Sequence, residues 1–315
     1  MRPHPGRQPA LPMDDRPALT SDATSVGEAM RTVLRDCLAE ARTAMEDAGR
    51  SDAQAVHDFR RAMKRWRALL RLVEPLVGPE ARRLRDHGRD CAHALSSARD
   101  GQSALDALAD IEKHELALSE RSIAGLRKRI EDIRSTAETT LNPDMRLALG
   151  RMLDEAESAV GAWPLEGVSF DAVAGALARG YRGARNLIPA DWTSASAEAL
   201  HELRKRVVIH RYQIEIIEPL WPRFVKMWTG EAQRLRERLG KHQDLLVLAG
   251  LTGPHQPLAR WRSRLSPPIA QRRAAHVAAA QGIAARLFLE KPKALHQRLI
   301  GMWEVGRGEG VRAAE

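Results

Sequence analysis

The amino-acid sequence predicts an all-α fold built from two tandem helical bundles of about four or more helices each. Leucine, alanine, arginine and glutamate are plentiful while aromatic residues make up only 4% of the chain, a mixture that favours helices over strands. No run of four to eight residues alternates between apolar and polar as a half-buried strand would. Two long segments, 144 positions apart, have nearly the same sequence. A repeat at this spacing indicates a duplicated domain rather than a solenoid of units of about 20–50 residues.

With 315 residues, the chain is long enough for two domains with apolar cores. Residues 1–22 contain prolines at positions 3, 5, 9, 12 and 17 and lack the apolar run of a signal peptide, so we expect a disordered tail. The first half then covers residues 23–162, and the second half covers residues 163–315, beginning at a connector around Trp163–Gly167. No stretch of eighteen apolar residues predicts a membrane span. The two cysteines, Cys37 and Cys91, lie among leucines and alanines and fit core packing in a reducing cytoplasm.

Capping residues and breakers place the helices of the first half in order. Ser25 or Thr24 caps a first helix that closes near Gly49. A basic helix follows and should stop at Pro75, because the residue before a proline is turned away from helical geometry. Beyond the Gly78–Pro79 turn, we expect helices over residues 80–98, 99–120 and 121–140. After a break at Asn142–Pro143, another helix should continue to Val160.

The second half repeats this order. Ser169 caps a helix that ends before Pro189, and Ser194–Ser196 leads into the second basic helix. The segment 231–251 matches the region of the first half that contains Arg99–Asp100. Residues 252–268 contain four prolines and predict a loop with a short helical piece around Trp261. We expect the last long helix over residues 269–290 and a final helix from Lys291 to Trp303.

The repeated element is a basic helix that begins with a histidine. Because a helix advances about 100° per residue, positions three, seven, ten and fourteen after a start lie on one face. From His57 this face collects Arg60, Lys64, Arg67 and Arg71, and we call these five residues the first stripe. The flanking residues at its edges are Arg61 and Arg65.

The second copy has a weaker stripe. It contains His201, Arg204 and Arg211, with Lys205 and Tyr212 just beside them. Val208 stands where Lys64 stands in the first copy, and Glu215 stands where Arg71 stands. The sequence therefore predicts an unequal pair of basic helices.

A net charge of +9 and its concentration on the two repeated helices indicate a polyanionic partner. Arginine offers a planar fork of donors to phosphate oxygens and lysine a mobile point charge, so a row of both suits a line of phosphates. The alternative is a solvated helix face whose arginines pair with Asp58, Glu74 and Glu202. The two histidines either contact the ligand, with protonation strengthening binding at lower pH, or pack at the helix start.

On these residues the chain resembles the CHAD domain, the conserved histidine α-helical domain, whose mark is a histidine followed by arginines and lysines in both of two repeated halves. The first motif matches through His57, Arg60, Lys64, Arg65 and Arg67. The second matches through His201, Arg204, Lys205, Arg211 and Tyr212, with Val208 as a departure. Further resemblance lies in Arg99–Asp100, in Leu239–Asp244 with its Lys241, and in Lys291–Lys293.

The resemblance implies two bundles related by pseudo-twofold symmetry, a basic channel between them, and binding of inorganic polyphosphate in the cytoplasm, in some relatives at polyphosphate granules. Many relatives also carry a catalytic barrel with a Glu-x-Glu-x-Lys signature, whereas the nearest segment here, Glu155–Ala159, ends in alanine. The residues that we expect to bind polyphosphate are His57, Arg60, Arg61, Lys64, Arg65, Arg67, Arg71, Arg99, His201, Arg204, Lys205, Arg211, Tyr212 and Lys241.

Other functions are less well supported by the sequence. A nucleic-acid-binding or granule-scaffolding protein would share the positive charge, but no nucleic-acid reading motif is present, so we expect nucleic acid to bind only non-specifically. His201–Glu202 begins like a zinc-protease helix, yet Lys205 occupies the place of the second histidine. There is also no glycine-rich phosphate loop and no nucleophile elbow. We therefore expect no enzymatic activity, no metal and no cofactor.

Overall fold

The computed structural model describes residues 25–95, 99–114, 116, 118–136 and 141–313. The described residues form eleven α helices and two 3-10 helices and contain no strand, so the all-α prediction is confirmed. The predicted tail over residues 1–22 lies outside the described residues. The helices of the first half are α1 (Val26–Glu46), α2 (Asp52–Val77), α3 (Pro79–Ala94), α4 (Arg99–Glu112), α5 (Glu120–Thr136) and α6 (Pro143–Ala162). Those of the second half are α7 (Phe170–Arg185), α8 (Ala197–Ile214), η2 (Glu215–Leu220), α9 (Pro222–Leu251), η3 (Ala259–Trp261), α10 (Arg262–Leu287) and α11 (Pro292–Ala313).

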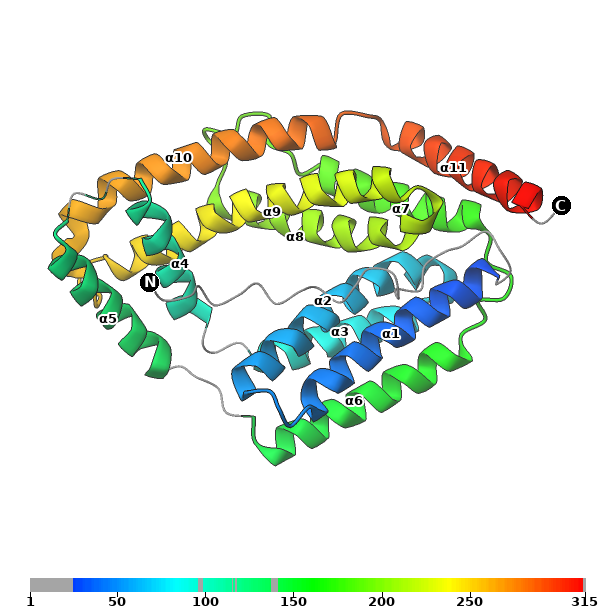
Figure 1. The fold of residues 1–315 in the computed structure, drawn as a ribbon, viewed down its shortest axis with the longest axis horizontal. Helices are drawn as coiled ribbons and strands as arrows, with labels where there is room; N and C mark the ends of the chain where they lie inside the picture. Colours follow the sequence, from blue (N-terminus) through cyan, green and yellow to red (C-terminus); the bar gives the residue numbers. More distant parts are fainter. Residues whose placement is uncertain (1–24, 96–98, 115, 117, 137–140, 314–315) are drawn as a thin grey trace.

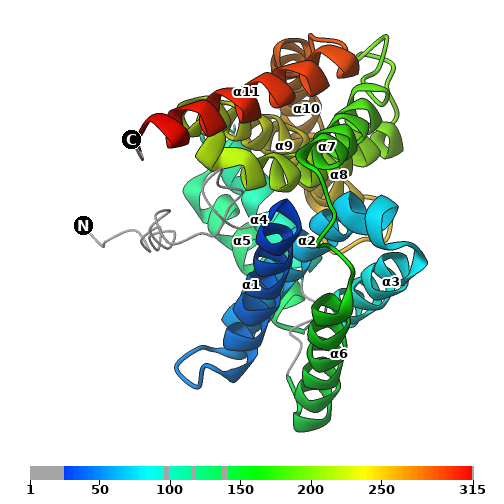
Figure 2. The same cartoon turned by 90° about the vertical axis from the view of Figure 1, so that its right-hand side faces the viewer.

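The helices pack into groups that do not follow the boundary between the two halves. Helices α1, α2, α3 and α6 lie together, and α2 packs against α7 and α8 of the second half (Figures 1 and 2). Their apolar faces share one large core with α9 and α11. Helices α4 and α5 lie at the other end of the molecule, where they form a second core with α9 and α10 (Figure 1). Each core therefore contains side chains from both halves.

The duplication is visible in matched contacts. Arg60 donates to the carbonyl oxygen of Leu95 at 3.0 Å, and Arg204, 144 positions later, lies over Gly240, where an added Cβ would be 3.4 Å from Nη2. These two arginines thus reach nearly equivalent positions on the following helical segment. The Glu74–Arg82 ion pair of 2.7 Å is likewise matched by Glu218–Lys226 at 3.6 Å.

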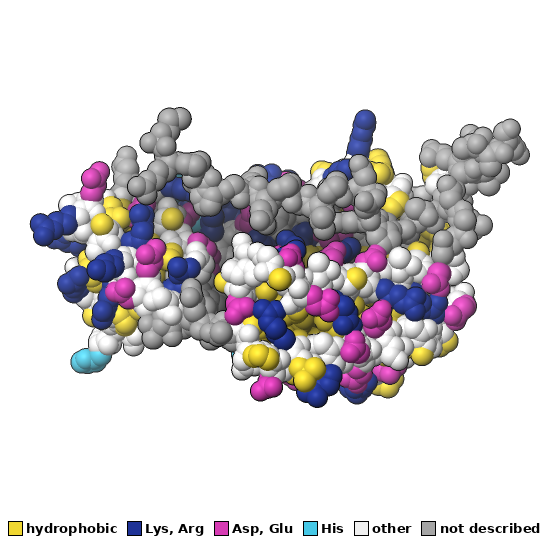
Figure 3. Space-filling model, turned by 60° about the horizontal axis from the view of Figure 1, so that its bottom comes forward, with side chains coloured by type: hydrophobic (Ala, Val, Ile, Leu, Met, Phe, Trp, Pro, Cys, Tyr) yellow, Lys and Arg dark blue, Asp and Glu magenta, His cyan; other side chains and the backbone are white. Residues whose placement is uncertain are grey.

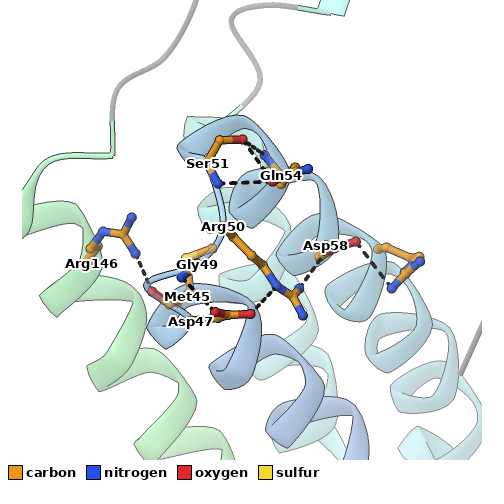
Figure 4. Close-up of polar contacts among 9 residues, drawn as sticks. Met45, Asp47, Gly49, Arg50, Ser51, Gln54, Asp58 and Arg146 are labelled. Carbon is orange, nitrogen blue, oxygen red and sulfur yellow. Dashed lines mark hydrogen bonds and ion pairs between the residues drawn. The ribbon is translucent and has the colours of Figure 1, made fainter. Parts of the chain in front are cut away.

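The turn before α2 fixes where the first basic helix begins (Figure 4). Ser51 and Gln54 form a capping box, which satisfies backbone N–H groups at the helix start. Arg50 joins Asp47 at 2.9 Å to Asp58 at 2.7 Å across this turn. Farther along the chain, α6 supplies Arg146, which donates to the carbonyl oxygen of Met45 and, at 2.8 Å, to Asp52 at the start of α2. The start of the basic helix is therefore tied to both α1 and α6.

Among the predicted boundaries that differ from the structure, two lie at prolines, because proline is tolerated where the lost bond is exposed. Helix α2 continues through the exposed Pro75 to Val77 and ends at Gly78, whose φ of 84° favours glycine. Helix α10 begins at Arg262 rather than near residue 269, with Pro267 and Pro268 inside it. Ser263 and Arg264, whose carbonyl groups lose a donor, are exposed, so water can satisfy them. No helix in the described part of the chain is long and apolar enough to cross a membrane.

Candidate functional site

The first stripe runs along the seam between α2 and α3. His57 and Lys64 are exposed, while Arg60, Arg67 and Arg71 are half-buried. Burial lowers the pKa of Arg67, and the neighbouring guanidinium groups of Arg89 and Arg85 on α3 lower it further. Among the described residues, neither Arg67 nor Arg71 forms an ion pair, although the nearby Asp86 and Asp90 partly offset the lowered pKa of Arg67.

At the end of this seam an open cleft of about 560 Å³ is lined by residues of α2, α3, α7 and α8. Four arginines from four helices line it, together with one carboxylate, that of Glu74. We call it the arginine cleft, and its arginines are Arg71 on α2, Arg82 on α3, Arg179 on α7 and Arg206 on α8.

Small residues keep the arginine cleft open. Gly78 forms its floor at the turn between α2 and α3, and Gly180 and Gly183 form its wall on α7. A Cβ at Gly180 would lie 2.2 Å from Oε1 of Gln213, so a larger residue here would displace the Gln213 side chain. Gln213 in turn donates to the carbonyl oxygen of Ala68 at 2.9 Å, in a buried contact. Helices α2, α7 and α8 are thereby fixed around the cleft.

The charges around the cleft repel one another. Burial lowers the pKa of Arg71 to about 10, and the nearby Arg85, Arg206 and Arg67 contribute to this shift. A guanidinium group with this pKa stays protonated at neutral pH, so the folded protein carries the cost of its desolvation and of the repulsion from its neighbours. Burial alone would raise the pKa of Glu74, but hydrogen bonds from Arg82 and Arg85 lower it. An anion in the cleft would relieve the repulsion around Arg71.

Three of the four cleft arginines are absent from the sequence prediction. Arg206 follows His201 by five positions, which turns it to a different face of α8 from the second stripe. Arg82 and Arg179 lie outside both basic helices. Their convergence depends on how α2 crosses α8, for which the sequence pattern contains no signal.

The second stripe is largely occupied by internal contacts. Lys205 pairs with Glu202 one turn earlier on the same exposed surface. Arg211 pairs with Glu215 at 2.6 Å and lies over the ring of the buried Tyr212 at 4.3 Å. None of these residues, nor the half-buried His201 and Arg204, lines the arginine cleft.

The edges of the first stripe are also paired. Arg61 lies 3.4 Å from Asp58 of the same helix. Arg65 is only 9% exposed and pairs with Glu40 on α1 at 2.9 Å. Arg65 therefore points toward α1, on a different side of α2 from the cleft.

The two outlying predicted residues lie on α4 and α9. Arg99 begins α4, and its side chain lies outside the described part of the structure. Lys241 on α9 lies 3.2 Å from Asp110 of α4. The described residues contain no group of three or more His, Cys, Asp and Glu side chains arranged to hold a metal ion.

On one face of the molecule, acidic and basic side chains are interspersed. The face turned forward in Figure 3 shows Lys and Arg beside Asp and Glu along much of its length. Cross-helix pairs such as Arg42–Asp154 at 2.6 Å and Arg83–Glu155 at 2.5 Å have this character. Exposed pairs of this kind contribute little to stability and leave little net charge. The arginine cleft differs from them because its arginines outnumber its carboxylates.

Comparison with known proteins agrees with this fold. The model of the CHAD domain family matches residues 32–252, which include both basic helices. The crystal structure of the CHAD domain from the plant Ricinus communis is similar, with a TM-score of 0.52 and 21% sequence identity over 93% of this chain and 97% of that chain. No curated protein sequence matches this chain. The match to the family model extends from α1 to the end of α9, and the chain belongs to the CHAD domain family.

Proposed function

We propose that this protein binds inorganic polyphosphate, with the arginine cleft as its principal site and the first stripe as its approach. The observation that carries the proposal is the convergence of Arg71, Arg82, Arg179 and Arg206 around one open cleft with a single carboxylate. Membership of the CHAD domain family supports the same ligand. We further propose that binding takes place in the cytoplasm, either in solution or at polyphosphate granules.

The chemistry of the cleft suits a chain of phosphates. Guanidinium groups form forked, charge-assisted hydrogen bonds to phosphate oxygens, and four helices present them from different directions. A polyphosphate chain has no bases to read, and the cleft supplies charge without an aromatic stacking surface among its lining residues. These features favour polyphosphate over a sequence-specific nucleic acid.

We propose a binding role rather than catalysis. The arginines of the cleft remain protonated and cannot serve as bases. The carboxylate of Glu74 is held by hydrogen bonds from Arg82 and Arg85, which lower its pKa and make it a poor proton acceptor.

Isothermal titration calorimetry with long-chain polyphosphate tests the proposal. If the four arginines each neutralise one phosphate, affinity should fall by about fiftyfold between 50 and 200 mM salt, taking about 0.7 in the logarithmic slope per contact. The double variant Arg71→Ala, Arg206→Ala should bind at least tenfold more weakly, because each lost bond to a charged group contributes about 1.5–3 kcal/mol. Its salt slope should also be shallower.

The matched control removes two positive charges from exposed pairs elsewhere, in Arg127→Ala, Lys226→Ala. This control should keep wild-type affinity within about threefold. Equal losses in the two double variants would show that a diffuse positive surface, and not the cleft, holds the ligand. Competition with duplex DNA distinguishes polyphosphate binding from the alternative function, nucleic-acid binding. Polyphosphate should displace the duplex from this protein, whereas a nucleic-acid-binding protein would retain the duplex.

A further inference from the structure

A buried carboxylate connects three helices at the end of the molecule away from the arginine cleft. Asp110 on α4 is 5% exposed, and its Oδ1 lies 3.2 Å from Nζ of Lys241 on α9. Its Oδ2 lies 2.8 Å from Nε2 of the fully buried His276 and 3.0 Å from Nε of Arg272, both on α10. One buried carboxylate thus faces two permanent cations and one imidazole, which leaves positive charge in excess.

The position of the proton on His276 follows from this contact. An ionised carboxylate can only accept, so Nε2 must carry the proton that it donates to Asp110. In the neutral ring Nδ1 is then an acceptor, and Nη1 of Arg238 on α9 lies 3.5 Å from it. Asp110 therefore fixes the orientation of the His276 ring, and the ring in turn orients the guanidinium group of Arg238.

The two side chains held in this way line a small pocket. Arg234, Glu237, Arg238 and Lys241 surround about 130 Å³ on one face of α9. That is roughly four times the volume of a water molecule of ~30 Å³, enough for a phosphoryl group of about four heavy atoms. Gln233 donates to Glu237 at 2.7 Å, and among the described residues Glu237 forms no ion pair with the pocket's cations.

We infer that this pocket on α9 is a second anion site, which accepts one phosphoryl group, and that Asp110 and His276 are its buried positioning residues. Arg238 and Lys241 would contact the phosphoryl oxygens, and Arg234 would close the N-terminal side. Because Lys241 and Arg272 share one carboxylate, Lys241 can turn toward a ligand while Asp110 keeps its bonds to Arg272 and His276. The α9 pocket has no lining residue in common with the arginine cleft, so it can be tested separately from the proposed function.

Calorimetric titration with inorganic pyrophosphate in the Arg71→Ala, Arg206→Ala background isolates the α9 pocket. We expect one pyrophosphate to bind in this background, and at least tenfold weaker binding once Lys241→Ala and Arg238→Ala are added. The control is Lys226→Ala, which removes one charge from the same helix outside the pocket. Pyrophosphate affinity in this control should stay within about twofold of the background.

Two further variants test the positioning role. His276→Phe removes both contacts of the imidazole and should weaken pyrophosphate binding by severalfold, whereas His276→Gln, which keeps a donor and an acceptor, should recover part of the loss. A purely structural role for His276 would lower the melting temperature without this difference in affinity. Because the pocket variants Lys241→Ala and Arg238→Ala change no fully buried residue, they test the site even if His276→Phe fails to fold.

The inference is overturned if pyrophosphate does not bind in the Arg71→Ala, Arg206→Ala background, or if removal of Lys241 and Arg238 leaves its affinity unchanged. A different result would show that the arginine cleft is not the polyphosphate site. In that case, the Arg71→Ala, Arg206→Ala variant would keep its affinity for long-chain polyphosphate. Titration of Arg238→Ala, Lys241→Ala with long-chain polyphosphate then identifies the source of the phosphoryl group. Weaker binding indicates that the polymer reaches the α9 pocket, and unchanged binding indicates a free phosphate or pyrophosphate.

Discussion

The two basic helices have the same motif but different surroundings. Helix α2 leads to Arg71 at the edge of an open cleft, whereas the matching position after α8 is Glu215, which pairs with Arg211. At the centre of each helix the matching residues also differ, since Trp66 is fully buried where the second copy has the fully buried His210, hydrogen-bonded to Trp228 at 2.9 Å. The backbone contacts of the repeat have been kept while its charge and core chemistry have diverged.

This difference teaches that duplication of a binding motif does not duplicate a binding site. The contacts of Arg60 and Arg204 with the following helical segment are matched, because they hold the helices in place. Arg71 of the first stripe lines the open positive cleft, whereas the second copy contributes Arg206, which lies outside the second stripe. We therefore expect the two stripes to contribute unequally to anion binding and the two basic helices to contribute comparably to folding.

The strongest challenge to this comparison is to reverse charges in the cleft and at the position that matches Arg71 in the second copy. Arg71→Glu combined with Arg206→Glu should lower the affinity for long-chain polyphosphate by at least about a hundredfold, because two charge-assisted contacts of about 1.5–3 kcal/mol are replaced by repulsion. Glu215→Arg should not raise affinity, and it should reduce stability because Arg211 loses its partner. Calorimetry and urea unfolding measure the two effects. An increase in affinity in Glu215→Arg would show that the second copy retains a latent site.

The core difference can be tested by truncation. Trp66→Ala should lower the free energy of unfolding by about 3–5 kcal/mol, the usual cost of removing a large buried aromatic side chain. His210→Phe should cost less, about 1–3 kcal/mol, because it leaves the indole N–H of Trp228 without its acceptor. Urea denaturation followed by far-ultraviolet circular dichroism measures both. A larger loss in His210→Phe would show that the His210 position is the more sensitive part of the shared core.

The same position makes the second half sensitive to acid. Burial lowers the pKa of His210 to about 3, whereas the unfolded chain titrates near 6.5. The unfolded state therefore takes up this proton first as the pH falls, so the stabilisation is complete above about pH 6.5 and declines below it. The loss should be on the order of 2 kcal/mol at pH 5.

Unfolding curves at pH 7 and pH 5 measure this loss, and His210→Phe should reduce the difference between the two curves. Burial, with contributions from Arg273 and His276, also lowers the pKa of His242 to about 4, so this residue should maintain part of the pH dependence in the variant. An unchanged pH dependence in His210→Phe would show that His210 does not contribute to it.

The smallest expected effect concerns Lys205. It is exposed and pairs with Glu202 on its own helix, so Lys205→Ala should change the affinity for polyphosphate by less than about twofold. Arg60→Glu with Lys64→Glu, on the first stripe, should cost far more. Titrations at one salt concentration compare the three proteins. Equal losses would mean that both copies contribute alike despite Val208.

The sequence predicted what depends on local periodicity. The helical character, the two basic helices and the shared face of Arg60, Arg67 and Arg71 all follow from residue spacing. The cleft could not be predicted in this way, because Arg179 and Arg206 meet Arg71 only where α7 and α8 pack against α2. The α9 pocket depends on Asp110, which is distant in sequence from Lys241 and His276.

The boundary of α10 shows a different limit of sequence reasoning. Four prolines between residues 252 and 268 favour a loop, yet two of them lie within the exposed first part of the helix. A proline has a high cost only where its missing bond cannot be replaced by water, and exposure is a tertiary property. The pattern of breakers alone could not distinguish the two cases.

The second core has a consequence for how the protein is made. The apolar faces of α4 and α5 are completed by α9 and α10, yet the ribosome finishes α4 at Glu112 well before it begins α9 at Pro222. At about 5–20 residues per second this interval lasts several seconds or longer, during which these faces remain uncovered in the nascent chain. Side chains such as Leu108, Ile111 and Leu126 are then open to chaperones and to neighbouring polypeptides. Folding of the first half therefore cannot be completed until most of the second half has left the ribosome.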